Sequence, residues 1–280
     1  MRPKGHGKNL TYYDFGRTTV YSLASDQQFC YTLYVPESYD ESAQQRHRLI
    51  VVVHGSERNF IGYRDNFVPL AETHSCIVLA PLFPVEPGRP DDWPSYKLLR
   101  SGGVAYDNVL LSMVEQVGTR YRLDDERFLL YGFSGGGHFA HRFYYAHPER
   151  LHGVSIGAPG VVTLLNRDYD YWVGVRNFKS VFGKEISLNT MRDVPVHTVI
   201  GGDDTETWEI TIKHGNPWWM EGADIAGLDR QARIKSLVDS LERQDIKVRQ
   251  DVVPGVAHDA EPMTDAVADF FDSILRGQRT

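Results

Sequence analysis

Residues 127–140 read Arg-Phe-Leu-Leu-Tyr-Gly-Phe-Ser-Gly-Gly-Gly-His-Phe-Ala, and this stretch decides the fold. Its first part, residues 128–131, is a short apolar run that ends at a glycine, which is typical of a buried strand. Its last part begins a segment, residues 138–146, that favours a helix until Pro148 ends it. A tight turn therefore joins a strand to a helix, with Ser134 at its centre.

The turn itself, Gly132–Gly136, fits the pattern Gly-x-Ser-x-Gly. Between a strand and a helix this pattern predicts a nucleophile elbow, a strained turn that presents a serine hydroxyl at the head of the helix. A side chain at Gly132 or Gly136 would collide with the neighbouring strand or helix. The alternative is a glycine-rich turn in which Ser134 only caps the helix.

The composition is that of a soluble globular protein. Of the 280 residues, 41% are hydrophobic and 24% are charged, and the formal net charge is -7. No run of Lys or Arg stands out, so we expect no nucleic-acid partner. Residues 1–9 are polar and lack the apolar core of a signal peptide, and no apolar stretch is long enough to span a membrane. We therefore expect a cytoplasmic protein.

Cysteines and potential metal ligands are sparse. Cys30 and Cys76 lie in strand-like settings, which favours buried thiols, although a disulfide between them remains an alternative. His138 and His141 are three residues apart on the predicted helix, but they lack the spacing and the third ligand of a zinc site. We expect neither a metal nor a cofactor.

Strands alternate with helices along most of the chain. Residues 18–23 and 29–35 predict an antiparallel hairpin. Further strands are expected at 49–53, 76–79, 153–156, 196–200 and 246–253, and helices at 62–74, 106–121, 138–146, 229–241 and 266–275. This order predicts a single α/β domain over residues 1–280, with a doubly wound, mostly parallel sheet. The aromatic segment 161–193 follows neither period and is expected to be an insertion near the active site.

Three reactive side chains follow predicted strands in the order Ser134, Asp204, His258. The carboxyl ends of parallel strands meet at one edge of a sheet, where functional groups gather. A serine hydroxyl needs an imidazole to take its proton, and that imidazole needs an acid to orient it. The sequence therefore predicts Ser134 as nucleophile, His258 as base and Asp204 as the acid.

Each of these roles has an alternative. Asp203 could replace Asp204 as the acid, although the Gly-x-x-Asp-Thr pattern favours Asp204, and both aspartates could simply cap the turn. His258 could be an exposed loop histidine. His54 also ends a strand, but it precedes the serine and is better explained as shaping the loop after that strand.

Backbone N–H groups would form the oxyanion hole. Gly135 comes directly after the nucleophile, and Ser56 lies in the loop after the first central strand. Glu57 is the next candidate donor. Because such donors act through the main chain, the identity of their side chains is weak evidence.

The chain resembles the α/β-hydrolase superfamily, in particular its esterase, polyhydroxybutyrate-depolymerase-like and dienelactone-hydrolase-like members. The residues that carry this resemblance are Tyr31–Pro36, Leu49–Gly55, Gly132–Gly136, Gly201–Thr205 and Gly255–His258. The resemblance implies attack by Ser134, an acyl-enzyme, and water as the second substrate. The run Gly55-Ser56-Glu57 has fewer glycines than lipase-like members have at this place.

Aromatic residues after the strands could shape specificity. Segment 161–193 either forms a lid over Ser134 or packs as a long loop on the sheet. Trp172, Trp218 and Trp219 are predicted to bind substrate, and the adjacent pair could instead form a contact in a homo-oligomer. We expect hydrolysis of a small or medium-sized ester; a serine peptidase, a thioesterase and a non-catalytic binding protein are the rival functions.

Overall fold

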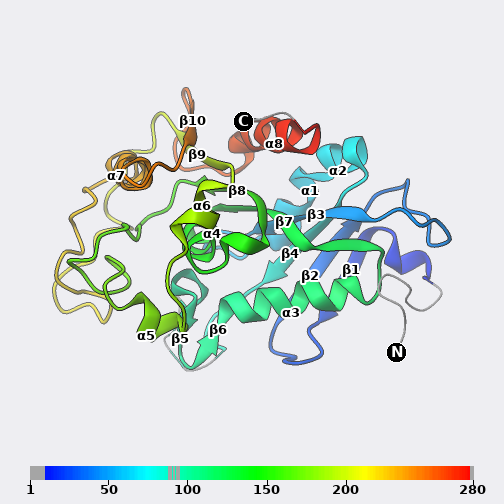
Figure 1. Ribbon diagram of the computed structural model, residues 1–280, viewed down its shortest axis with the longest axis horizontal. Helices are drawn as coiled ribbons and strands as arrows, with labels where there is room; N and C mark the ends of the chain where they lie inside the picture. The colour runs from blue at the N-terminus through cyan, green and yellow to red at the C-terminus, as the bar shows by residue number, and fades with distance from the viewer. Residues whose placement is uncertain (1–9, 88–89, 91, 93–94, 278–280) are drawn as a thin grey trace.

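The computed structural model describes residues 10–87, 90, 92 and 95–277, so the polar segment 1–9 lies outside the described residues. Eight strands form one sheet in the order β1-β2-β4-β3-β7-β8-β9-β10 (Figure 1). These strands are β1 (Gly16–Ser22), β2 (Cys30–Val35), β3 (His47–Val53), β4 (Ile77–Leu82), β7 (Leu123–Phe133), β8 (Leu151–Gly157), β9 (Val196–Gly201) and β10 (Val248–Val253). A separate small hairpin pairs β5 (Arg100–Ser101) with β6 (Val104–Ala105).

The sheet is mostly parallel, with an antiparallel edge. Strand β2 runs antiparallel to both β1 and β4, and the six strands from β4 to β10 are parallel to one another. The predicted fold class, a doubly wound sheet with an N-terminal hairpin, is therefore confirmed.

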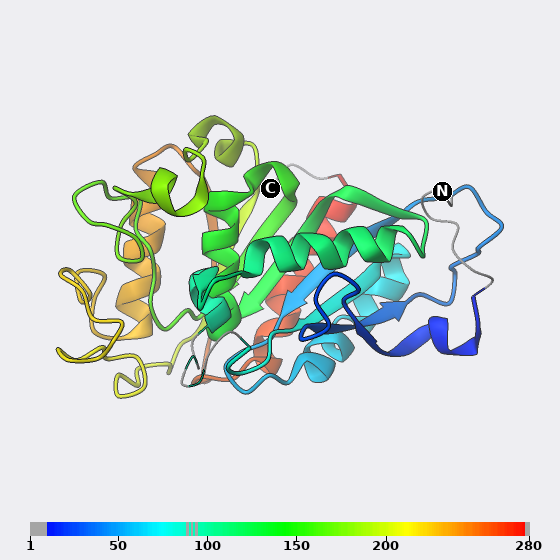
Figure 2. The same cartoon turned by 90° about the horizontal axis from the view of Figure 1, so that it is seen from below.

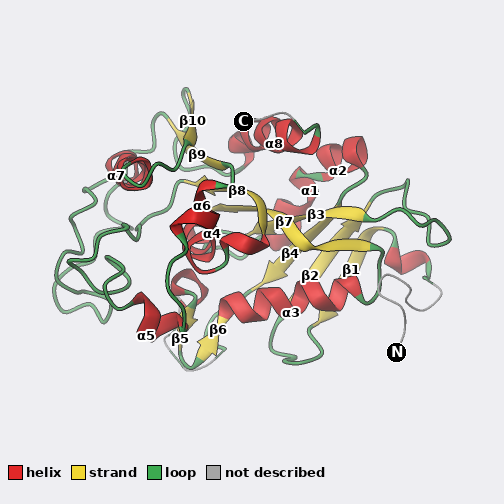
Figure 3. Cartoon of the chain, in the orientation of Figure 1, coloured by secondary structure: helices red, strands yellow, loops and turns green. Residues whose placement is uncertain are grey.

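Helices cover both faces of the sheet (Figures 2 and 3). One face carries α3 (Tyr106–Gly118) and α4 (Gly135–Ala146), and the other carries α1 (Phe60–Asn66), α2 (Val68–His74) and α8 (Thr264–Leu275). Helix α7 (Arg230–Glu242) packs beside β9 and β10, and α5 (Phe178–Phe182) and α6 (Leu188–Arg192) lie in the segment after β8. Short 3-10 helices cover Tyr12–Asp14, Ser95–Leu98, Pro148–Arg150 and Glu261–Met263. None of the helices in the described part of the chain is long and apolar enough to cross a membrane.

The continuous apolar run of β3 explains its central position. Leu49, Val51 and Val53 belong to the core on the side of α3 and α4, whereas Ile50 and Val52 belong to the core on the side of α1, α2 and α8. Successive side chains of a strand point to opposite faces, so a strand covered on both faces must be apolar throughout.

The segment predicted as one helix over 62–74 consists of two helices. They meet at Phe67, whose φ and ψ of -97° and 4° are not helical. Pro69 lacks an N–H and cannot continue the hydrogen bonds of α1, but it fits the first turn of α2. The proline thus ends one helix and begins the next.

Segment 161–193 contacts neighbouring helices: the Tyr145 hydroxyl of α4 donates to the carbonyl of Thr163, and the Ser240 hydroxyl of α7 accepts the N–H of Leu165. Val162, Leu164 and Phe178 belong to the same core as α3 and α4. The ring of Tyr171 contacts the rings of Phe178 and Phe182. Most of the backbone of this segment is irregular. Its buried apolar side chains therefore follow neither the helical nor the strand spacing. That the segment forms a lid over Ser134 stays a prediction.

Elsewhere in the core, Cys76 is buried, and both it and Cys30 are free thiols.

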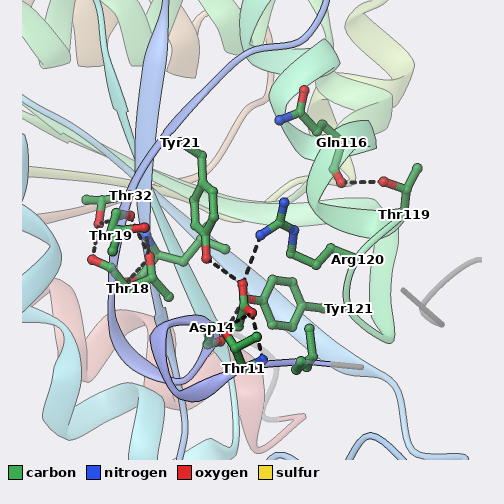
Figure 4. A network of polar contacts seen from close by, with 12 residues as sticks. Thr11, Asp14, Thr18, Thr19, Tyr21, Thr32, Gln116, Thr119, Arg120 and Tyr121 are labelled. Carbon is green, nitrogen blue, oxygen red and sulfur yellow. Dashed lines mark hydrogen bonds and ion pairs between the residues drawn. The ribbon is translucent and has the colours of Figure 1, made fainter. Parts of the chain in front are cut away.

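A polar cluster attaches the N-terminal segment to the end of α3 (Figure 4). The carboxylate of Asp14 accepts hydrogen bonds from the Tyr21 hydroxyl and the Arg120 guanidinium, both at 2.9 Å. The Thr11 amide donates to the same carboxylate at 2.8 Å. Burial alone would raise the pKa of Asp14, but these hydrogen bonds and the charge of Arg120 lower it below its usual value.

Two adjacent glycines at the end of β9 provide a matched test of packing. A Cβ on Gly201 would lie 2.2 Å from the carbonyl oxygen of Val256, whereas a Cβ on Gly202 would lie no closer than 3.4 Å to any atom. We expect Gly201→Ala to lower the free energy of unfolding by roughly 1–3 kcal/mol, because backbone would have to move. Gly202→Ala should change it by less than about 0.5 kcal/mol. Denaturant unfolding of both variants tests this; equal stabilities would contradict the close approach.

Candidate active site

The carboxyl ends of five neighbouring strands, β3, β7, β8, β9 and β10, lie at one edge of the sheet. In the sheet, Val53 pairs with Gly132, Phe133 with Gly157, and Gly201 with Val253. The loops that begin after these residues carry Ser56, Ser134, Asp204 and His258. The strand register therefore brings the predicted site residues to one edge of the sheet.

Ser134 occupies the strained turn that the sequence predicts. Its φ and ψ are 55° and -113°, and its N–H donates to the carbonyl of Gly157 at 2.8 Å. A Cβ on Gly132 would lie 2.1 Å from the carbonyl oxygen of Gly136, and a Cβ on Gly136 would lie 2.1 Å from that of Val53. Helix α4 thus starts in direct contact with β3 and β7, and only glycine permits this approach.

Asp204 and His258 are joined directly. Nδ1 of His258 lies 2.6 Å from Oδ2 of Asp204, which is fully buried. The His258 ring stacks on Phe133 with the ring centroids 4.8 Å apart. Ser134 lines the same cavity as His258. The hydrogen bonds between these described residues join Asp204 to His258 but not His258 to Ser134.

The two aspartates at the end of β9 lie in different surroundings. Asp203 is exposed, and its N–H donates to the carbonyl of Val256 at 2.9 Å. Asp204 points inward, where Oδ1 also accepts a hydrogen bond from Nη1 of Arg230 at 3.1 Å. Of the two candidate acids, only Asp204 contacts His258 within the described residues.

The backbone N–H groups of Gly135 and Ser56 lie near each other. A Cβ on Gly135 would be 3.3 Å from the Ser56 nitrogen. The N–H of Gly135 is in the first turn of α4 and has no acceptor within the helix. The hydroxyl of Tyr96 holds the loop after β3 in place, because it donates to the carbonyls of His54 and Gly55 at 3.1 and 3.0 Å.

Three buried histidines support the loops around Ser134. Nε2 of His54 accepts the N–H of Phe83 at 3.1 Å, Nε2 of His138 accepts that of Val161 at 3.0 Å, and Nε2 of His141 accepts that of Thr163 at 3.0 Å. Burial lowers the pKa of His54 to about 3, and burial lowers the pKa values of His138 and His141 well below 6.5. All three rings are therefore neutral and act as hydrogen-bond acceptors that shape the site.

Two cavities meet at Ser134. The first, about 730 Å³, is lined by Ser56, Ser134, Lys97, Val161, Ile210 and Trp218, among others. The second, about 560 Å³, is lined by Ser134, His258, Tyr63, Phe133 and Glu261, among others. Both volumes fall in the range of small-molecule sites.

The three predicted tryptophans differ in position. Trp218 lines the first cavity. Trp172 is buried, and its indole N–H donates to the carbonyl of Trp218 at 3.0 Å. Trp219 is 40% exposed, and its ring contacts His214. The binding roles of all three tryptophans stay predictions.

Sequence reasoning missed several charged residues around the site. Arg230 links Asp204 to Glu209, with a 2.9 Å ion pair to the latter. Arg142, buried on α4, donates from Nη1 to the carbonyl of Lys97 at 2.6 Å and from Nε to Oγ1 of Thr163 at 2.8 Å. These residues belong to no motif. The sequence places both arginines in predicted helices but does not indicate which groups they contact. Within the described residues, no three His, Cys, Asp or Glu side chains are grouped as a metal would require.

Comparison with known proteins identifies the fold. No protein-family model matches the chain, and no curated protein matches it in sequence. Solved structures do match. A poly(3-hydroxybutyrate) depolymerase from Bordetella parapertussis has a TM-score of 0.71 and 24% identity, over 92% of this chain and 90% of the depolymerase. Poly(aspartic acid) hydrolase-1 from Sphingomonas sp. KT-1 has a TM-score of 0.67 and 20% identity, over 96% and 98% of the two chains. An S-formylglutathione hydrolase from Staphylococcus aureus has a TM-score of 0.61 and 15% identity, over 92% and 97%. The chain has the α/β-hydrolase fold.

The buried neutral histidines predict acid lability. Because the folded pKa of His141 lies below the unfolded value of about 6.5, the unfolded chain binds a proton that the folded chain excludes. Stability should therefore fall as the pH falls below about 6.5, by up to about 1.4 kcal/mol per pH unit for each such histidine. His141→Gln keeps an acceptor for the Thr163 N–H. It should lower by one the number of protons taken up on unfolding, and the slope of stability against pH should fall accordingly. The unfolding free energy of the variant at pH 8 gives the cost of the substitution to packing, and values between pH 6.5 and 4.5 give the slope. The same slope in the variant and in wild type would show that His141 is not a neutral buried histidine.

Proposed function

We propose that this protein is a serine hydrolase that cleaves a carboxylic ester of a small or medium-sized molecule through an acyl-enzyme on Ser134. The observation that carries the proposal is the 2.6 Å hydrogen bond between His258 and buried Asp204, at the strand ends that also present Ser134. The fold supports it, since solved structures that share the fold include a polyester depolymerase and a ferulic acid esterase.

The roles follow from the chemistry of the groups. Nε2 of His258 takes the proton of the Ser134 hydroxyl as its oxygen attacks the ester carbonyl. The carboxylate of Asp204 keeps the proton of the imidazole on Nδ1 and stabilises the imidazolium that forms. The oxyanion accepts hydrogen bonds from the N–H groups of Ser56 and Gly135. His258 then donates its proton to the leaving alcohol, and water releases the acid by the reverse steps.

Thioesters and peptides react by the same steps. Transfer of an acyl group to water is therefore common to an esterase, a thioesterase and a serine peptidase. Hydrolysis rates for an ester, a thioester and an amide of one acyl group would rank them. A non-catalytic binding protein is the remaining alternative, and it predicts no turnover of any of the three.

The nucleophile can be tested by labelling and by turnover. We expect a fluorophosphonate to add one covalent label to the wild-type chain, located on Ser134 by peptide mass, and none to Ser134→Ala. Hydrolysis of a short-chain p-nitrophenyl ester should fall in Ser134→Ala by a factor on the order of 10⁶. Label on another residue, or equal turnover by the two proteins, would refute the proposal.

The adjacent aspartates provide a matched pair of variants. Asp204→Asn should lower kcat by a factor on the order of 10⁴, because an amide no longer holds the required tautomer of His258. Asp203→Asn should retain kcat within about threefold, since the Asp203 side chain is exposed and does not contact His258. Melting temperatures of both variants control for folding, because Asp204 also pairs with Arg230. Comparable losses in the two variants would show that Asp204 is not the distinct acid of the site.

A further inference from the structure

The two cavities that meet at Ser134 differ in their relation to the proposed acid. His258 lines the second cavity and is not among the residues that line the first. The leaving alcohol must lie beside His258, which gives it a proton. The second cavity therefore receives the alcohol and the first cavity receives the acyl group, an assignment that rests on the proposed function of Ser134 as nucleophile.

Lys97 lies in the first cavity, directly beside the elbow. A Cβ on Gly135 would be 2.9 Å from Cε of Lys97 and 3.3 Å from the Ser56 nitrogen. The ammonium group, one bond beyond Cε, therefore lies close to the oxyanion donors. Lys97 is half-buried, and burial lowers the pKa of its amine to about 8, so the side chain is a cation at neutral pH.

Lys97 forms no ion pair within the described residues, although the charges of Glu209 and Glu57 both attract it. Glu209, which lines the same cavity, pairs with Arg230 at 2.9 Å. Besides these two carboxylates, the cations Arg58 and Arg142 act on Lys97 and repel it. Two negative and two positive charges therefore surround Lys97, and its own charge is in excess.

The wall behind Lys97 adds a second unpaired cation. Arg142 is fully buried, and the groups that accept its hydrogen bonds, the Lys97 carbonyl and the Thr163 hydroxyl, are neutral. No carboxylate of the described residues forms an ion pair with it. Buried charges are normally paired. Lys97 and Arg142, neither of which forms an ion pair among the described residues, give this side of the cavity an excess of positive charge, which an anionic ligand would satisfy.

We propose that the acyl group of the substrate carries a carboxylate, so that the enzyme cleaves a half-ester of a dicarboxylic acid, and that Lys97 binds this carboxylate. Val161, Ile210 and Trp218 line the same cavity and contact the intervening methylene groups. Hydrolysis breaks the bond between acyl carbon and alkoxide oxygen; water supplies hydroxide to the acyl carbon and a proton to the alcohol.

The substrates for a test are the monoethyl esters of succinic, glutaric and adipic acid, each paired with its carboxamide analogue. The amide has nearly the shape of the carboxylate but no charge. Ethanol release gives kcat/KM for each. We expect wild type to favour the anionic ester of the best-fitting length by about 10- to 100-fold, the range of a charge-assisted hydrogen bond.

Variants at Lys97 separate charge from size. Lys97→Met should reduce the ratio of kcat/KM for the anionic and neutral esters to near one, and Lys97→Arg should retain most of it. Lys235→Met, which removes an exposed lysine on α7, is the matched control and should leave both rates unchanged. A wild-type ratio of one or less, or a preference that survives in Lys97→Met, would overturn the inference.

Binding to a protein that cannot turn over distinguishes this inference from the proposed function. Ser134→Ala should bind monoethyl glutarate at least about tenfold more tightly than the amide by calorimetry, and added salt should reduce the difference. This result without turnover by wild type would reject the catalytic proposal and keep the anion site. Turnover of the neutral ester with equal binding of both ligands would reject the anion site and keep the catalytic proposal.

Discussion

The close approach of helix α4 to strands β3 and β7 is the constraint on which the rest of the site depends. The first turn of α4 can contact the carbonyl of Val53 only because Gly136 has no side chain. This contact fixes the direction in which Ser134 leaves the strand and the position of the Gly135 N–H. The loop after β3 lies on the other side of the same contact, so Ser56 is set by the same approach.

The proposed acid is held by two groups of different kinds, an imidazole and a guanidinium. His258 and Arg230 bind opposite oxygens of the Asp204 carboxylate, and α7 supplies Arg230 near its first residue. A buried carboxylate with both oxygens hydrogen-bonded has little freedom to rotate. Helix α7, which contributes nothing to the motifs, therefore orients the proposed base, His258, through the proposed acid, Asp204.

The sequence predicted most of the fold because its signals were local. The apolar run before Gly132, the glycines of the elbow and Pro148 lie within a few residues of one another, and the order of strand ends follows from alternating elements. The positions of Lys97, Arg142 and Arg230 depend on contacts between residues far apart in the chain, for which no local pattern exists. The break at Phe67 was missed because Pro69 is compatible with the first turn of a helix as well as with a boundary. The extent of segment 161–193 could not be read from periodicity, since tertiary packing rather than regular backbone buries its side chains.

Arg142 ties Lys97, which lines the first cavity, to Thr163, which follows the cavity residue Val161 by two positions; it donates to the carbonyl of Lys97 and to the hydroxyl of Thr163. Neither Lys97 nor Thr163 can move away from Arg142 without breaking a hydrogen bond to its fully buried guanidinium. A buried donor left without an acceptor is costly. The cavity is accordingly formed before any ligand arrives. A ligand that fits it binds without the entropic cost of ordering loops, so selection among ligands depends on shape and charge rather than on closure.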